Sequence, residues 1–270
     1  MMNRVSAETI KEKFKDIRSF LLDMDGTFYL EDRLLKGSID FLKALERTGR
    51  TARFLTNNSS KSGEFYAQRL RKMGVNERYM DVITSGQAAG SYCLKHRPGQ
   101  KCYVLGNDML KAELTAMGLE IVEDGADYVL VGFDTSLDYQ KLCKVCDYIR
   151  YGKPYIATHP DFNCPTKEGF IPDTGSFMAL IEASTGRKAD LVIGKPNAGI
   201  VKEAMARTGY SAHETAIVGD RLYTDVATAK NFGMMGILVL TGETKMEDIN
   251  NSPVQPDLIF ERLSSMIPYL

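Results

Sequence analysis

Disulfide pairs and membrane segments are what this sequence most clearly lacks. It has five cysteines, an odd number that fits reduced thiols better than a disulfide framework. No stretch approaches the ~18 consecutive apolar residues of a membrane-spanning helix. Residues 1–15 mix charged side chains with isolated apolar ones and lack the apolar segment of a signal peptide. We therefore expect a cytoplasmic protein that has no membrane partner.

A surplus of positive charge is also missing. Lysine and arginine total 34, and aspartate and glutamate total 35, for a formal net charge of −1. Nothing in this balance steers the protein toward nucleic acid, and no charged block indicates a tail. Hydrophobic residues make up 44% and charged residues 26% of the 270, which is typical of a folded chain with one large domain or two modest ones.

Several signatures of enzyme chemistry are absent as well. The sequence has no G-x-x-x-x-G-K-[ST] loop, no G-x-G-x-x-G after a predicted strand, and no G-x-S-x-G. Kinases and serine hydrolases of those types therefore lose support. Cys143 and Cys146 form a single C-x-x-C within a predicted helix. Because two further zinc ligands are not evident nearby, we interpret both as small apolar residues on a buried helix face.

What is present is an alternation of short apolar runs with helical patterns. Strands are predicted at 19–23, 53–56, 82–84, 102–105, 128–133, 155–158, 216–219, 236–240 and 258–260, and helices at 37–48, 62–73, 87–96, 108–117, 137–150, 176–184, 197–208 and 225–232. Residues 169–172 are expected to form a loop, and a final helix is expected after residue 260. Alternating strands and helices predict an α/β chain with parallel sheets.

Carboxylates follow two of the most apolar predicted strands. Asp23 and Asp25, in the sequence D-M-D-G-T, come where the strand at 19–23 ends. Asp220 ends the strand at 216–219, and Asp225 begins the next helix with Thr224 as its expected N-cap. Ligands of open α/β sheets bind at the carboxyl ends of strands, and neighbouring carboxylates repel each other unless they share a cation or a proton.

Two further segments carry groups that suit a phosphate. Thr56 to Ser60 (TNNSS) follow a strand with hydroxyl and amide donors, although by themselves they could simply cap the next helix. Lys195 lies between Gly194 and Pro196 before a helix, where a single lysine is usually solvated. Together with the carboxylates, these groups describe a phosphoryl-transfer site that binds a hard cation such as Mg²⁺. An aspartate can serve there as the nucleophile.

The ordered set DMDGT at 23–27, TNNSS at 56–60, GKPN at 194–197 and GDRLYTD at 219–225 resembles the haloacid dehalogenase (HAD) superfamily of phosphohydrolases. Thr27 and Thr56 are only 29 positions apart, whereas Asn58 and Lys195 are 137 apart, which leaves room for a second α/β unit between motifs two and three. That arrangement resembles the subclass IIA, NagD-like p-nitrophenyl phosphatase branch. The resemblance implies a Rossmann-like core of residues 1–84 and 188–270 and an α/β cap of residues 85–187 that sets substrate specificity.

The resemblance also implies a role for each motif residue. Asp23 would be the nucleophile and a Mg²⁺ ligand, and Asp25 the general acid and base that lends its backbone carbonyl to the metal. Asp220 would be the third metal ligand, and Asp225 would orient Lys195 and metal-bound water. Thr56 and Asn57 would bind the phosphoryl group, and Asn58 is a further expected substrate-binding residue. Lys195 would neutralise charge on the nucleophile and the phosphate. The implied activity is Mg²⁺-dependent hydrolysis of small phosphate monoesters through an aspartyl-phosphate.

Selectivity for the leaving group is left open by the sequence. His159 and Asp161, in a cap loop after a predicted strand, are candidate substrate contacts, although His159 fits an ordinary loop residue equally well. Glu168 and residues 173–175 are similar candidates, with Gly175 allowing a close backbone approach. A phosphotransferase or phosphomutase with the same intermediate and a non-catalytic phosphometabolite-binding module remain alternatives. A dehalogenase is disfavoured by Asp25 and a membrane pump by the missing membrane helices. A homodimer remains open.

Overall fold

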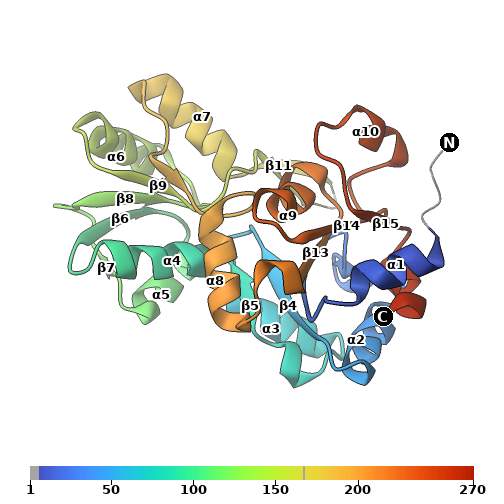
Figure 1. Cartoon of the computed structure of the whole chain (residues 1–270). Coiled ribbons are helices and arrows are strands. Elements are labelled where there is room, and N and C mark those ends of the chain that lie inside the picture. Colours follow the sequence, from blue (N-terminus) through green and yellow to red (C-terminus); the bar gives the residue numbers. More distant parts are fainter. Residues whose placement is uncertain (1–5, 167) are drawn as a thin grey trace. The chain divides into compact units, whose positions relative to one another are not determined.

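The computed structural model of the chain describes residues 6–166 and 168–270, which form two compact units. The core unit comprises residues 6–55, 67–82 and 204–270, and the inserted unit comprises residues 56–66 and 83–203. Each unit is built on a parallel sheet with helices, as Figure 1 shows, so the α/β class is confirmed. The limits 84/85 and 187/188 remain a prediction, and the TNNSS loop groups with the inserted unit.

The larger sheet has six strands in the order β15-β14-β13-β1-β4-β5. Their bounds are β1 Ser19–Leu22, β4 Thr51–Thr56, β5 Val82–Thr84, β13 Thr215–Gly219, β14 Met235–Val239 and β15 Leu258–Phe260. All four residues of β1 and all five of β13 are buried, as expected for strands that helices cover on both faces. A short hairpin of β2 (Tyr29–Leu30) and β3 (Arg33–Leu34) follows β1.

The register of this sheet determines where the first and last motifs emerge. β1 pairs in parallel with β13, with Leu22 opposite Val218, and in parallel with β4, with Leu22 opposite Phe54. Because β1 and β13 point the same way, the residues that follow them, Asp23 and Asp220, leave the sheet at the same edge. This is the carboxyl edge, where α/β sheets place their ligands.

The helices of the chain connect these strands. Their bounds are α1 Ala7–Phe14, α2 Ser38–Arg47, α3 Gly63–Lys72, α4 Ser85–His96, α5 Asp108–Met117, α6 Tyr139–Arg150, α7 Thr174–Thr185, α8 Ala198–Thr208, α9 Ala227–Asn231 and α10 Met246–Asn251, with 3₁₀ turns at Glu77–Tyr79, Ala212–Glu214 and Leu263–Tyr269. α9 packs on β13 and β14, while α1 and α2 contact the C-terminal 3₁₀ turn. Helix α1 was not predicted, because Phe14 is its only buried residue.

The inserted unit has a five-stranded parallel sheet of its own, in the order β12-β9-β8-β6-β7. The bounds are β6 Lys101–Leu105, β7 Glu120–Ile121, β8 Tyr128–Val131, β9 Tyr155–Ala157 and β12 Leu191–Val192. In Figure 1, α6 and α7 lie on one side of this sheet, and α4 and α5 lie on the other. Buried residues of β6, β8, β9, α6 and α7 form one apolar core.

Two predictions about the inserted unit were wrong. Residues 169–172 are not a loop: they form β11 (Gly169–Pro172), which pairs antiparallel with β10 (Asn163–Thr166). Its side chains are all exposed, so no buried face marks the strand in the sequence. Cys146 is buried in the apolar core, but Cys143 is exposed, so the two cysteines do not share a buried face.

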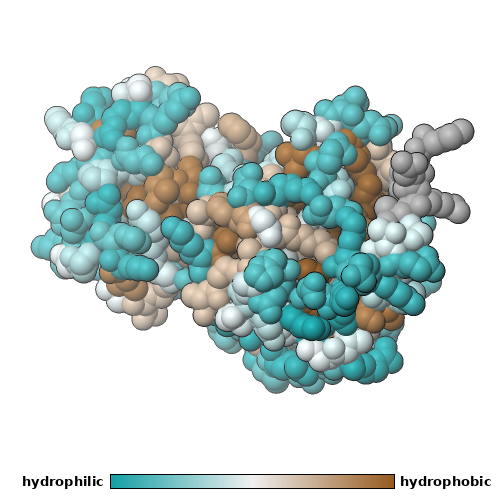
Figure 2. Space-filling model, viewed as in Figure 1, coloured by the Kyte–Doolittle hydropathy of each residue, from teal (hydrophilic) through white to brown (hydrophobic). Residues whose placement is uncertain are grey.

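The visible face of the molecule carries both hydrophilic and apolar residues (Figure 2). Figure 2 shows hydrophilic residues over most of the visible face, with apolar residues gathered in separate patches. Within the part of the chain that the structure describes, no helix combines the length and the apolar character needed to cross a membrane.

Candidate active site

The predicted site residues divide between the two units. The core unit holds Asp23, Asp25, Asp220 and Asp225, and the inserted unit holds Thr56, Asn57, Asn58, His159, Asp161 and Lys195.

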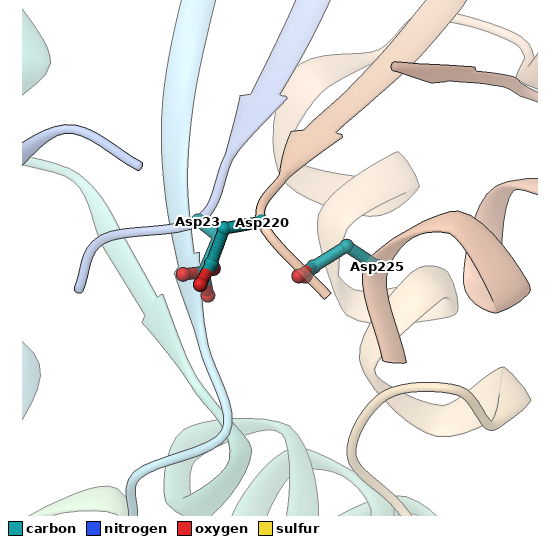
Figure 3. A group of neighbouring side chains, drawn as sticks. All are labelled: Asp23, Asp220 and Asp225. Carbon is teal, nitrogen blue, oxygen red and sulfur yellow. The ribbon is translucent and has the colours of Figure 1, made fainter. Parts of the chain in front are cut away.

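Three carboxylates converge at the carboxyl edge of the core sheet. One carboxylate oxygen from each of Asp23, Asp220 and Asp225 lies within 4.8 Å of the others. Figure 3 shows the carboxylates of Asp23 and Asp220 side by side below their strands, with that of Asp225 directed toward them from a helix. Asp220 and Asp225 are buried, and Asp23 is partly buried. Such close negative charges repel one another, and a bound cation or a shared proton relieves that repulsion.

Asp220 is held by the loop after β14 and by the turn after β1. The backbone N–H of Glu243 donates to its Oδ2 at 2.7 Å, and the hydroxyl of Thr27 donates to its Oδ1 at 3.4 Å. A Cβ atom would lie 1.9 Å from this Oδ2 at Gly242 and 2.6 Å from it at Gly26, which has φ +79°. Only glycines therefore allow the two backbones to approach this carboxylate so closely.

Asp225 is held against the end of β13. The backbone N–H of Arg221 donates to its Oδ2 at 3.3 Å, and a Cβ at Gly219 would lie 2.1 Å from its carboxyl carbon. The predicted helix start was wrong in detail. Residues Leu222–Val226 form a π-helical turn with Arg221 at its N-cap, and α9 begins only at Ala227. This extra turn directs the Asp225 carboxylate toward the carboxylates of Asp23 and Asp220.

Asp25 follows Asp23 by two positions at the same end of β1. Burial raises its pKa above the ordinary value, although the positive charges of Arg69 and Arg221 and a hydrogen bond from Tyr29 oppose this effect. A raised pKa favours the protonated carboxyl, which is the form that a general acid needs. Arg69, on α3, also donates to the backbone carbonyl of Glu31 and to the carboxylate of Asp32, so it fixes the β2–β3 hairpin.

Arg221 was missed in the sequence analysis, although it lies within the GDRLYTD motif. It forms an ion pair with Glu243 at 2.9 Å. Burial lowers the pKa of its guanidinium, but the negative groups around it, including Asp23, Glu243 and Asp220, outweigh that effect and raise it. Arg221 is therefore a fixed positive charge beside the acidic group. Only its place in the motif could have indicated this role.

The chemistry of the acidic group fits a divalent metal ion. All its side-chain donors are carboxylate oxygens, the ligands that Mg²⁺ and Ca²⁺ prefer, and thiol or imidazole ligands are not part of it. Asp23, Asp220 and Asp225 could each contribute one oxygen. The predicted ligand set differs in naming Asp25, through its backbone carbonyl, in place of Asp225.

In the inserted unit, the TNNSS loop is anchored by its own side chains. Asn58 Oδ1 accepts from the backbone N–H of Ser60 at 2.9 Å and from its hydroxyl at 2.8 Å, and Thr56 Oγ1 accepts from the N–H of Asn58 at 3.2 Å. Ser59 Oγ accepts from the N–H of Phe133 at 2.9 Å. These bonds fix a loop whose Thr56, the last residue of β4, is 7% exposed.

Asn57 and Lys195, also in the inserted unit, are joined by a pair of hydrogen bonds. The N–H of Lys195 donates to Asn57 Oδ1 at 2.7 Å, and Asn57 Nδ2 donates to the carbonyl of Lys195 at 3.0 Å. Lys195 is 2% exposed, so the solvated position that is usual for a single lysine does not apply here.

His159 is fully buried in the inserted unit. Its Nε2 lies 2.9 Å from Asp173 Oδ1, and its Nδ1 lies 2.9 Å from Thr158 Oγ1. This burial favours a positioning role over contact with a leaving group. Asp161 is partly buried and accepts from Asn57, while Glu168 is exposed. Gly175 packs closely against the protein's own loop, since a Cβ there would lie 2.3 Å from the carbonyl oxygen of Pro160.

Two family models match the chain, one described as haloacid dehalogenase-like hydrolase over residues 20–120 and one as HAD hydrolase-like over residues 192–266. An acid sugar phosphatase of Staphylococcus aureus is 35% identical over 257 residues, covering 95% of this chain and 99% of its own.

Solved structures are similar as well. The 4-nitrophenylphosphatase of Thermotoga maritima superimposes with a TM-score of 0.91 at 46% identity, over 95% of this chain and 98% of its own. A glycerol phosphate phosphatase of Mycobacterium tuberculosis, in complex with calcium, gives 0.85 at 30% identity, over 94% and 76%. This chain therefore belongs to the haloacid dehalogenase-like hydrolases, in the branch of the NagD-like p-nitrophenyl phosphatases.

Proposed function

We propose that this phosphatase hydrolyses small phosphate monoesters, sugar phosphates among them, in a Mg²⁺-dependent reaction through an aspartyl-phosphate on Asp23. The observation that carries the proposal is the convergence of Asp23, Asp220 and Asp225 within 4.8 Å beside Asp25, whose pKa burial raises. The substrate class is supported by two of these relatives, which are an acid sugar phosphatase and a 4-nitrophenylphosphatase.

In the first proposed step, a carboxylate oxygen of Asp23 attacks phosphorus, and the bond between phosphorus and the ester oxygen breaks. Asp25 donates its proton to the departing alkoxide, which leaves as an alcohol. In the second step, water attacks the phosphorus of the aspartyl-phosphate, and the bond between phosphorus and the Asp23 oxygen breaks. Asp25, now a carboxylate, takes a proton from that water. Inorganic phosphate leaves, and both aspartates return to their starting states.

Mg²⁺ bound at the acidic group would neutralise the charge that phosphoryl oxygens bring beside three carboxylates. Asp220 is already fixed by the Glu243 N–H, so it would hold the ion without rearranging. We propose that Thr56, the backbone of Asn57 and the Lys195 ammonium bind the remaining phosphoryl oxygens. Asp225 would then also orient Lys195.

The test is hydrolysis of p-nitrophenyl phosphate with and without Mg²⁺ by the wild type and by Asp23→Asn. An amide is a poor nucleophile, so we expect the variant to lose at least about three orders of magnitude in kcat. Asp16→Asn, at an exposed aspartate of the core unit, is the matched control and should behave like the wild type. Near-normal turnover by a folded Asp23→Asn protein would refute the proposal.

A further inference from the structure

The side chain of Asn57 is engaged entirely within the inserted unit. Its Oδ1 accepts from the N–H of Lys195 at 2.7 Å, and its Nδ2 donates to the Lys195 carbonyl at 3.0 Å. The same Nδ2 lies 3.2 Å from both carboxylate oxygens of Asp161. A primary amide has two hydrogens to donate, and both already have acceptors here. The side chain thus offers no further proton to a phosphoryl oxygen.

Gly194 is the residue that lets the two segments come this close. A Cβ atom there would lie 2.6 Å from Asn57 Oδ1 and 2.8 Å from the carbonyl oxygen of Thr158. Its own N–H donates to that carbonyl at 2.7 Å. The backbone of Gly194, just before Lys195, therefore packs closely between Asn57 and Thr158.

Asp161 is fixed from its other side. Its backbone carbonyl accepts from the N–H of Gly175, in the first turn of α7, at 2.8 Å. A Cβ at Gly175 would lie 2.3 Å from the carbonyl oxygen of Pro160, so this approach also depends on glycine. With its main chain held, Asp161 directs its carboxylate to the Asn57 amide. A charged acceptor makes that hydrogen bond stronger than a neutral one, and it polarises the amide that binds Lys195.

We propose that Asn57 and Asp161 are positioning residues that together fix the backbone of Lys195, and that Asp161 does not read the leaving group. This inference rests on the proposed function, in which the Lys195 ammonium neutralises the phosphoryl group. The sequence predicted that the Asp161 side chain contacts the substrate. In this inference Asp161 instead acts through Lys195, so its effect on the rate is the same for every ester. A displaced lysine stabilises the transition state less, so the loss falls on kcat.

The experiment compares Asp161→Ala and Asp161→Asn with the wild type on p-nitrophenyl phosphate and on glucose 6-phosphate. Because misplacing a catalytic group by about 1 Å can cost ~100-fold, we expect Asp161→Ala to lower kcat by about 10- to 100-fold, equally for both esters. Asp161→Asn keeps an oxygen that accepts from Asn57 and should recover most of this loss. Asp138→Ala is the control. Asp138 Oδ1 accepts a hydrogen bond too, at 2.8 Å from the backbone N–H of Lys141, but at the start of α6. Its removal should leave kcat unchanged.

A second readout does not depend on activity. Amide hydrogen exchange at Lys195 N–H, whose acceptor is Asn57, should accelerate in Asp161→Ala, while that at Gly194 N–H, whose acceptor is Thr158, should change little. A kcat/KM loss confined to glucose 6-phosphate would assign Asp161 to the leaving group and overturn the inference. Unchanged kcat and unchanged exchange would overturn it too. If the wild type hydrolyses neither ester, the proposed function fails. Amide exchange at Lys195 then still decides whether Asn57 and Asp161 fix the backbone of Lys195.

Discussion

The Nε2 atom of His159 lies 2.9 Å from Oδ1 of Asp173, and both side chains are buried in the inserted unit. Burial alone lowers the pKa of His159, but the charge and hydrogen bond of Asp173, helped by Asp161 and opposed by Lys195, outweigh it and raise that pKa above its ordinary value. The folded protein therefore binds a proton at His159 more tightly than the unfolded chain does.

This pair predicts a pH dependence of stability. A raised pKa stabilises the fold fully below the unfolded value of 6.5, and the gain is lost as pH rises through the folded pKa. The free energy of unfolding of the wild type, relative to His159→Asn, should fall above pH 6.5 by at most about 1.4 kcal/mol per pH unit. Urea unfolding from pH 5 to 9 measures it, and a constant difference across that range would contradict the assignment.

Metal binding should depend on Asp220. Asp220→Asn keeps the shape of a side chain that accepts the Glu243 N–H but removes one of three grouped negative charges. We expect Mg²⁺ affinity to fall at least about tenfold, because carboxylate charge dominates the attraction for a hard cation. Titration calorimetry on the folded protein measures the affinity, with Asp16→Asn as the control. Equal Mg²⁺ affinity in the Asp220→Asn variant and the wild type would exclude Asp220 as a ligand.

The close packing of Gly242 should matter as much as the charge. A Cβ there would lie 1.9 Å from Asp220 Oδ2, so Gly242→Ala must displace the carboxylate or the loop. We expect a stability loss of about 1–3 kcal/mol together with weakened Mg²⁺ binding. Gly125→Ala is the control, since φ is +74° there and a Cβ would meet open space. It should lower stability alone, and a similar result for Gly242→Ala would show that Asp220 tolerates displacement.

The contribution of Asp25 to the rate of the first step should depend on the leaving group. Asp25→Asn removes the proton that the raised pKa keeps available. An alkoxide needs this proton far more than p-nitrophenolate does, so the first step should slow by about 10²- to 10⁴-fold for a sugar phosphate and much less for p-nitrophenyl phosphate. Single-turnover kinetics isolate that step. Equal slowing with both esters would argue against proton donation by Asp25.

The sequence was sufficient to predict the layout around the core carboxylates. Asp23 and Asp220 each follow a continuous apolar run, which is the pattern of a buried parallel strand, and the structure places both runs side by side. The environment of Lys195 could not be predicted, because its backbone is hydrogen-bonded to Asn57, 138 positions away in the chain. His159 does lie in a loop, as one of the two sequence interpretations expected, but its burial and its contact with Asp173 could not be predicted.

Two further elements could not be predicted from the hydrophobic pattern of the sequence. Strand β11 shows no alternation between buried and exposed side chains, so its hydrogen bonds with β10 leave no trace in hydropathy. The π-helical turn at Leu222–Val226 likewise depends on packing, since Asp225 must sit against Gly219. Hydrophobic periodicity reports burial, and these elements are determined by backbone pairing and close contact.

The most direct test of the central claim is to find the phosphoryl group on Asp23. The wild-type protein is mixed with substrate carrying ³²P in a single turnover, quenched with acid and digested. We predict that the label is found on the peptide containing Asp23, that it forms and decays at rates consistent with kcat, and that it is absent from Asp23→Asn. Full turnover without a labelled protein, or with the label on another residue, would contradict the account.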